Sequence, residues 1–377
     1  MEFTGTCFFY LFLIFVLYSL CNTGQKKGNI KYIVAAYIIL FVVSAIRFDV
    51  GNDFDRYVDD IKYIFQQSSN SGKNLFQAFN EYDGEFSFLL ISWAIGKVFS
   101  QDSYYLVFAI YSFVSLYFLY RALDKYHCHS LGLVLYFFTE SLFFTWDGIR
   151  QGAALSIILY AFVFIKDRQF LKYALCIAFA TFFHTSAIIL LPFYLISYLK
   201  VNRWINIGII GVVLIGFWMG VFKEVVEQAS ILFSFMDNDY SRYENAIATL
   251  TTYESFNWKI RVSIYALFWM SIINACEDDN NFYSTLITIG AVIFILANGS
   301  LIFYRISLYF TIATLFAVPL SLHHKQAQLK RLFLVTMIAG MGLFFVYDTI
   351  TGSYTRGCVP YKTILSEDAE NKRFRPD

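Results

Sequence analysis

Three basic side chains in apolar surroundings have the types and positions that could do chemistry. Arg150 and Arg305 lie in or beside apolar runs, and His184 lies in the stretch FFHTSAII. Ionisable side chains at membrane depth are costly and generally face a cavity, a pathway or a partner. Arginine presents a planar donor fork that suits phosphate oxygens, and histidine exchanges protons near neutral pH. We therefore predict that these three residues are catalytic.

A second group of residues is predicted to bind the substrate. Arginines and outer-loop groups would hold sugar or phosphate, and tyrosine faces with hydroxyl groups suit sugar rings, although tyrosine is also common at membrane interfaces. Three of the carboxylates, Asp53, Glu85 and Asp147, rival His184 as the base. The predicted substrate-binding residues are Arg47, Asp49, Gly51, Asp53, Tyr57, Glu85, Asp147, Gln151, Arg242, Tyr243 and Tyr309.

Simpler interpretations compete with these roles. Arg47 could extend to the lipid headgroups, Arg150 could pair with Asp147 at a helix end, and His184 could be a packing residue. Arg305 is harder to explain in this way because its neighbours, YRISLYF, include no carboxylate. The small residues around Arg150, such as Gly152, either let helices pack closely or let a large ligand approach the backbone.

The composition is that of a membrane protein. Of 377 residues, 58% are hydrophobic and only 15% are charged, well below the quarter that is usual in globular domains. The net charge of +1 gives no reason to expect nucleic acid. The six cysteines lack ligand or disulfide spacing, the acidic stretch after residue 48 lacks calcium-loop spacing, and no G-x-G-x-x-G motif follows a strand. No cofactor and no metal site is predicted.

Apolar runs predict an all-α polytopic membrane protein with roughly 11–13 transmembrane helices. We expect a single transmembrane domain over residues 1–348, with outer loops at 48–85 and 223–257, and a short polar C-terminal tail at 349–377. The run 131–145 is expected to be one span. The run 86–99 is short and could be a re-entrant or interfacial helix. The run 170–199 could be two short helices or one long one, and His184 and Pro192 favour a break.

The basic turns orient the spans. Four basic segments, at 25–31, 165–172, 200–203 and 323–331, are expected on the cytoplasmic side by the positive-inside rule. The acidic segment 49–85 and the loop 223–257 then lie outside. This orientation places Arg47, Arg150, His184 and Arg305 in the outer half of the helical bundle.

The same residues carry a resemblance to a known family. The ordered motifs RFDVGNDFDRY (47–57), EFSF (85–88), IRQGAAL (149–155), FHTSAIILLP (183–192), DYSRY (239–243) and YRISLYF (304–310) resemble the EpsG-type family of bacterial polysaccharide polymerases, which are akin to Wzy-type O-antigen polymerases. Each motif alone is weakly specific, and their order over most of the chain gives the match its strength. Asn52 departs from the family pattern, where threonine is expected.

The resemblance implies an activity and a location. Such enzymes are metal-independent glycosyltransferases that resemble the GT-C membrane type. They join oligosaccharide repeat units carried on undecaprenyl diphosphate into O-antigen or exopolysaccharide. The expected location is the bacterial inner (cytoplasmic) membrane, with the active site facing the periplasm. The implied partners are the undecaprenyl-diphosphate-linked donor and acceptor and the lipid bilayer; a chain-length regulator and a flippase are candidate partners, and no nucleic acid is expected.

Two other classes stay open at this point. A transporter or flippase of lipid-linked oligosaccharide would also need a cationic cavity, but it should show internal repeats and a charged path to both faces. A membrane O-acyltransferase acting on polysaccharide would also carry intramembrane histidine and arginine, and the ordered motifs fit it less well.

Overall fold

The protein is almost entirely helical. The computed structural model describes residues 3–69, 74–82, 84–199, 201–222, 256–276, 281–297, 301–323 and 327–365. It is 83% helical, and within these residues the only extended pairing is an isolated antiparallel bridge between Arg47 and Thr363. The predicted all-α fold is therefore confirmed.

Among the described residues, five helical segments are long and apolar enough to cross a membrane. They are Phe3–Lys27, Asp102–Asp124, Ile149–Lys166, Ile302–His323 and Gln328–Thr351. Seven further apolar helices have 10–17 residues. The chain is thus a multi-pass membrane protein. The segment α5 (Phe86–Gly96) has only 11 residues, about 16 Å of helix, which is too short for the hydrocarbon core. That length agrees with the predicted re-entrant or interfacial helix.

The described chain divides into two compact units, whereas the apolar runs predict a single transmembrane domain over residues 1–348. The first unit comprises Met1–Phe164, Gln169–Leu191 and Met341–Asp377, and the second comprises Ile165–Arg168 and Pro192–Gly340. Three elements cross the boundary: the helix α9 (Ile149–Lys166), the 3₁₀ segment η2 (Thr185–Tyr198) and the long helix α19 (Gln328–Thr351).

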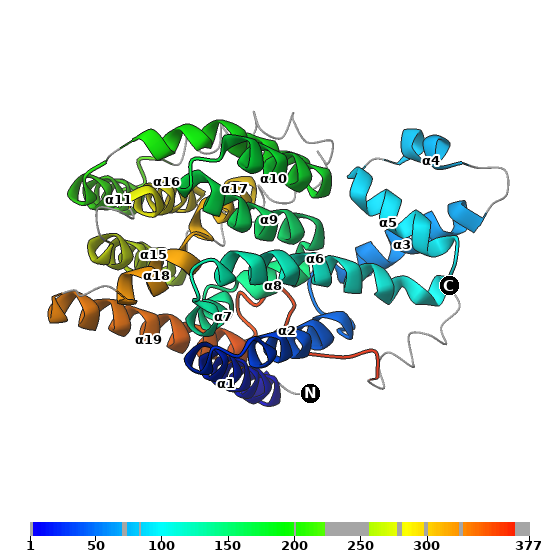
Figure 1. Cartoon of the computed structure of the whole chain (residues 1–377), viewed down its shortest axis with the longest axis horizontal. Helices are drawn as coiled ribbons and strands as arrows, with labels where there is room; N and C mark the ends of the chain where they lie inside the picture. The colour runs from blue at the N-terminus through cyan, green and yellow to red at the C-terminus, as the bar shows by residue number, and fades with distance from the viewer. Residues whose placement is uncertain are drawn as a thin grey trace. The chain divides into compact units, whose positions relative to one another are not determined.

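Residues from distant parts of the sequence pack together in the first unit. Its helices α1 and α2 lie side by side (Figure 1), α1 also packs on α7, α2 packs on α6, and α3 packs on α5. Its elements are α1 (Phe3–Lys27), α2 (Ile30–Ala45), α3 (Phe54–Ser69), α4 (Leu75–Glu81), α5 (Phe86–Gly96), η1 (Gln101–Tyr104), α6 (Tyr105–Asp124), α7 (His129–Phe138), α8 (Ser141–Asp147), α9 (Ile149–Lys166) and α10 (Phe170–Phe183).

The second unit is a smaller helical bundle. Its helix α16 packs on α17, α11 and α15, and α18 packs on α15 and α16. The helices are α11 (Arg203–Trp218), α15 (Phe256–Ala275), α16 (Asn281–Ala297), α17 (Leu301–Thr311) and α18 (Thr314–His323). Of the predicted site residues, α17 carries Arg305 and Tyr309.

Two breaks in apolar runs shape the first unit. The predicted break at His184 is confirmed, because α10 ends at Phe183 and a 3₁₀ segment begins at Thr185. The expectation of one continuous span over 131–145 is wrong, because α7 ends at Phe138 and α8 begins at Ser141. Between them Glu140 has a φ of 56°, and the Thr139 hydroxyl bonds the Leu135 carbonyl at 2.7 Å. Polar side chains that bond nearby groups favour helix ends over helix interiors.

Residues 352–365, from the predicted polar tail, form an ordered strap against the segment that follows α2. The amide of Phe48 donates to the Lys362 carbonyl at 3.0 Å, and the amide of Ile364 donates to the Ile46 carbonyl at 2.9 Å. The Tyr10 hydroxyl of α1 donates to the Cys358 carbonyl at 2.7 Å. In Figure 1 this strap is the red trace beside α2.

The glycine at position 152 lets α8 and α9 meet. A Cβ added to Gly152 would lie 2.6 Å from the Cα of Thr145, far inside van der Waals contact. Of the two interpretations of the small residues after Arg150, close helix packing is therefore the one that applies at Gly152.

We expect Gly152→Ala to lower the free energy of unfolding by about 1–3 kcal/mol, the usual cost of overpacking a core. The matched control is Gly208→Ala in α11, where an added Cβ meets nothing within 4 Å. That change should be neutral or should stabilise the helix by up to about 1 kcal/mol, because alanine has the higher helix propensity. Thermal unfolding in detergent measures the stability of both variants. Equal unfolding midpoints for the two variants would contradict the close packing of α8 and α9 at Gly152.

Candidate active site around Glu85

The carboxylate of Glu85 joins two of the predicted catalytic side chains. Its Oε2 accepts a hydrogen bond from Nη1 of Arg150, and its Oε1 lies 2.5 Å from Nδ1 of His184. The three side chains are largely enclosed, with 10%, 18% and 20% of the Glu85, Arg150 and His184 side chains exposed. Glu85, Arg150 and His184 therefore form one cluster, which we call the Glu85 cluster.

The ends of three helices position the Glu85 cluster. Glu85 is the N-cap residue of α5, but its side chain makes no capping hydrogen bond and instead reaches Arg150 and His184. Arg150 stands in the first turn of α9, directly after the interruption at Gly148. His184 terminates α10 in an extended conformation, with its amide bonded to the Ala180 carbonyl at 2.9 Å. The interruption at Gly148 and the end of α10 at His184 thus position two of the three side chains.

Aromatic rings enclose the guanidinium group of Arg150. The Tyr57 ring from α3 and the Phe88 ring from α5 have their centroids 5.5 and 5.6 Å from it. The Tyr82 ring stacks on Phe88 with an interplanar angle of 19°. Cation–π contact of this kind stabilises a poorly hydrated cation. The predicted substrate-binding residue Tyr57 therefore meets Arg150 directly, and α3 buries Phe54, Tyr57 and Ile61 on one side.

The Glu85 carboxyl group is held in its ionised form. Burial alone raises its pKa, but the hydrogen bond with His184 and the charge of Arg150 outweigh burial and lower the pKa from its ordinary 4.5 to about 2. An ionised Glu85 accepts a hydrogen bond from the N–H at Nδ1 of His184. The second ring nitrogen, Nε2, is then the basic one, because a neutral imidazole carries one N–H and one acceptor.

Asp147 has partners of its own. Its Oδ2 accepts from Nη1 of Arg356 at 3.3 Å, and its Oδ1 accepts from the backbone amide of Asp53 at 3.3 Å. The sequence predicted two alternatives for Asp147: an ion-pair partner of Arg150, or a participant in the chemistry. The structure pairs Arg150 with Glu85 and Asp147 with Arg356. Sequence reasoning missed Arg356, because it lies 209 positions from Asp147 in a stretch taken for a polar tail.

Arg47 is buried and does not reach the headgroups. Only 2% of the residue is exposed, and its guanidinium lies 5.1 and 5.9 Å from the ring centroids of Phe108 and Trp146. Its Nη1 donates to the Ser44 carbonyl and, at 3.0 Å, to the Ser112 hydroxyl. Within the described residues, Nε and Nη2 have no partner. Burial lowers the pKa of Arg47 to about 10. The headgroup interpretation is therefore wrong.

Asp49 and Gly51 belong to the contact with the strap. The Asp49 carboxylate accepts from Nζ of Lys362 at 3.0 Å. Gly51 has a φ of 107° and lies against the Asp147 backbone, where an added Cβ would be 3.1 Å from the Asp147 Cα. A left-handed φ and this close approach both favour glycine. Asp49 therefore ties down the strap, and Gly51 shapes the surroundings of Asp147.

The remaining predicted site residues lie elsewhere. Gln151 is buried in α9, next to Arg150. Arg305 is half-buried and Tyr309 is buried, and both belong to the second unit. Arg242 and Tyr243 lie outside the described residues. The roles of all five stay predictions.

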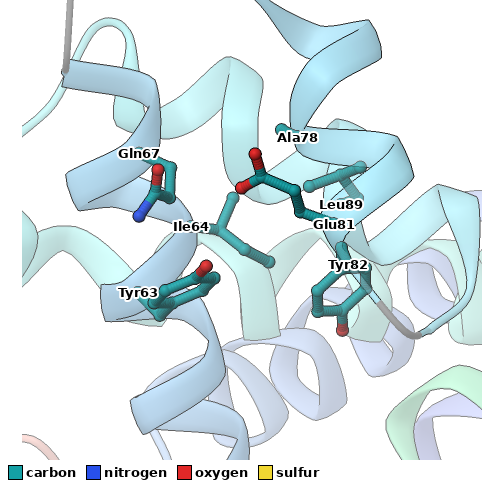
Figure 2. A pocket seen from close by; sticks show the side chains of 7 residues that line it. All are labelled: Tyr63, Ile64, Gln67, Ala78, Glu81, Tyr82 and Leu89. Carbon is teal, nitrogen blue, oxygen red and sulfur yellow. The ribbon is translucent and has the colours of Figure 1, made fainter. Parts of the chain in front are cut away.

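A small hollow lies between α3, α4 and α5 (Figure 2). It is lined by Tyr63, Ile64, Gln67, Ala78, Glu81, Tyr82 and Leu89. Figure 2 shows the Gln67 amide and the Glu81 carboxylate on opposite sides of it. Among the described groups, Oε1 of Gln67 is buried without a partner. Tyr82 lines this hollow and also stacks on Phe88, so the hollow adjoins the aromatic surroundings of Arg150.

The fold and the site define a class of protein. It is a helical multi-pass membrane protein in which an arginine and a histidine share one largely buried carboxylate. Within that class, the chain belongs to the EpsG family, whose model matches residues 30–363. Searches of curated proteins and of solved structures find no match. The resemblance in the sequence motifs is thereby confirmed, and membership supports a general role as a polymerase in polysaccharide biosynthesis.

The pKa of Glu85 predicts how stability depends on pH. Because the folded-state pKa is lowered to about 2, the unfolded chain takes up the proton first on acidification. The stabilisation from the Glu85 carboxylate is therefore complete above pH 4.5 and is lost as the pH falls toward 2. Thermal unfolding of the wild type and Glu85→Gln should differ most near neutrality and converge in acid. A difference that stays constant or widens in acid would contradict this assignment.

Proposed function

We propose that the protein polymerises oligosaccharide repeat units carried on undecaprenyl diphosphate, at the outer face of the bacterial inner membrane. The product would be O-antigen or exopolysaccharide. The observation that supports this most strongly is the Glu85 cluster, because it combines a base candidate with a phosphate-binding candidate. Membership of the EpsG family supports the same class of reaction.

In this proposal His184 is the general base. Glu85 holds Nδ1 and thereby orients the ring with Nε2 toward the acceptor hydroxyl, an arrangement of carboxylate and histidine that recurs in nucleophilic catalysis. No hydrogen bond to Nε2 is present within the described part of the chain. A correctly placed base of this kind contributes roughly 10²–10⁴-fold to the rate.

Arg150 would bind the diphosphate and stabilise the charge that develops on it. A guanidinium has five N–H donors, so contact with Glu85 through Nη1 is compatible with contact to phosphate oxygens through other donors. The low exposure of the site strengthens such charge–charge contacts. The first turn of α9 also places Arg150 at a helix N-terminus, where the helix dipole favours an anion.

The bonds and protons balance without another reactant. The acceptor hydroxyl attacks the anomeric carbon of the donor sugar and its proton passes to Nε2 of His184. The new bond joins this oxygen to the anomeric carbon, and the bond from that carbon to the diphosphate oxygen breaks. The lipid diphosphate leaves as an anion held by Arg150. The transition state would have oxocarbenium character, as in other glycosyl transfers.

The other predicted residues complete the proposal. Positive-inside orientation supports an outward-facing site. Arg305 is proposed as a second ligand of the diphosphate, and Tyr57, Asp53 and Tyr309 as substrate contacts. The arginines supply the positive charge in this scheme, so no metal is assigned a role.

Removing either catalytic side chain should abolish long polysaccharide. We expect Arg150→Ala and His184→Gln each to lower the rate of polymerisation by roughly 100-fold or more, because each removes transition-state stabilisation or the base. Arg150→Lys should rescue poorly because lysine lacks the planar fork. The measurement is the ladder of surface polysaccharide on a gel, which should collapse to a single repeat unit.

The controls are matched by residue type. Arg121→Ala removes an exposed arginine that contacts Tyr117, and His127→Gln replaces an exposed histidine; both should leave the ladder intact. Protein levels in the membrane should be equal for all variants. Normal ladders from both Arg150→Ala and His184→Gln would refute the proposal.

A further inference from the structure

We infer that Arg356 is a positioning residue that keeps Asp147 from competing with Glu85 for Arg150. The inference rests on the proposed function, because it assigns Arg356 a part in preparing the same site. Two carboxylates and two arginines lie near the junction of α8 and α9, and the structure joins them as two separate pairs, Glu85 with Arg150 and Asp147 with Arg356.

The strap holds Arg356 in a defined place. The Arg356 carbonyl accepts from the amide of Asn52 at 3.0 Å, and the Gly357 carbonyl accepts from the amide of Gly51 at 3.0 Å. An added Cβ at Gly357 would lie 2.6 Å from Oδ1 of Asn52, so the two segments touch closely there. The guanidinium of Arg356 lies 5.1 Å from the ring centroid of Phe144. Both the backbone and the side chain of Arg356 are thus located by contacts within the first unit.

Asp147 needs a cation. Its side chain is 10% exposed, and a carboxylate removed from water is costly unless it is paired. The Asp53 amide and Arg356 each occupy one of its oxygens. The nearest arginine or lysine along the chain is Arg150, three positions later across the interruption at Gly148. Because Arg150 lies so near in the chain, we expect Asp147 to compete for it when Arg356 is lost.

Capture of Arg150 by Asp147 would disable the Glu85 cluster. Arg150 would leave the position between the Tyr57 and Phe88 rings, and Glu85 would keep only His184. Arg356 therefore acts through Asp147 on Arg150, without needing to touch the substrate. The signature of such a role is that Arg356 matters only while Asp147 is charged.

A double-mutant cycle tests this signature. Arg356→Met, which keeps length but removes charge, should lower polymerisation of lipid-linked repeat units by about tenfold, the size expected for coupled neighbours. In an Asp147→Asn background, the same Arg356→Met change should alter the rate by less than about twofold. Arg356→Lys should retain most activity, because lysine can still pair with Asp147. Rates are measured on membranes with equal amounts of each variant.

The control variant breaks the other ion pair of the same strap. Lys362→Ala removes the contact with Asp49, whose side chain is 29% exposed, and should leave the rate within about twofold of the wild type. A loss as large as that of Arg356→Met would mean that the strap acts only as a structural tie, which overturns the inference.

Other outcomes also decide the question. Wild-type activity in Arg356→Met overturns the inference. A loss of activity that is equally large when Arg356→Met is added to Asp147→Asn overturns it too, because Arg356 would then act directly on the substrate. If Arg356→Met does not accumulate in the membrane, comparison of Arg356→Lys with Arg356→Gln gives the same decision. Failure of the proposed function itself has a different result, because Arg150→Ala would then also leave polymerisation unchanged.

Discussion

The first unit depends on a carboxylate that is shared by an arginine and a histidine. Glu85 is largely buried, so its negative charge is tolerable only because Arg150 and His184 both engage it. This requirement fixes three helix ends at once: the start of α5, the start of α9 and the end of α10. A loose arrangement of these ends would leave a charge buried without a partner. The energetic need to pair a buried charge thus also fixes the relative positions of the three side chains.

The pairing of charges is the part of the site that the sequence could not show. Hydropathy predicts the helices, and His184 with Pro192 predicts the break after α10, because a proline and a polar residue interrupt an apolar run. The apolar surroundings of Arg150 and His184 predict their importance, because charge in hydrocarbon is costly. Sequence proximity, however, suggested Asp147 as the partner of Arg150, whereas the structure pairs Arg150 with Glu85, 65 positions away.

Three other features escaped prediction for similar reasons. The interruption between α7 and α8 involves neither proline nor glycine, and its only signal is the polar group Thr139–Ser141 within an apolar run. The burial of Arg47 depends on Phe108 and Trp146, which come from two other helices. Residues 352–365 are polar enough to resemble a tail, yet their backbone pairs with the segment after α2. In each case long-range packing, rather than local composition, decides the outcome.

The strap has a consequence for biosynthesis. Residues 352–365 leave the ribosome after every described helix has been made, yet they contact the segment between α2 and α3, which is made among the first. A chain interrupted before position 352 would contain all of these helices and could insert into the membrane, but it would lack Arg356. The ion pair between Arg356 and Asp147, and the pairing of the whole strap with the segment after α2, can therefore form only after translation has passed residue 365.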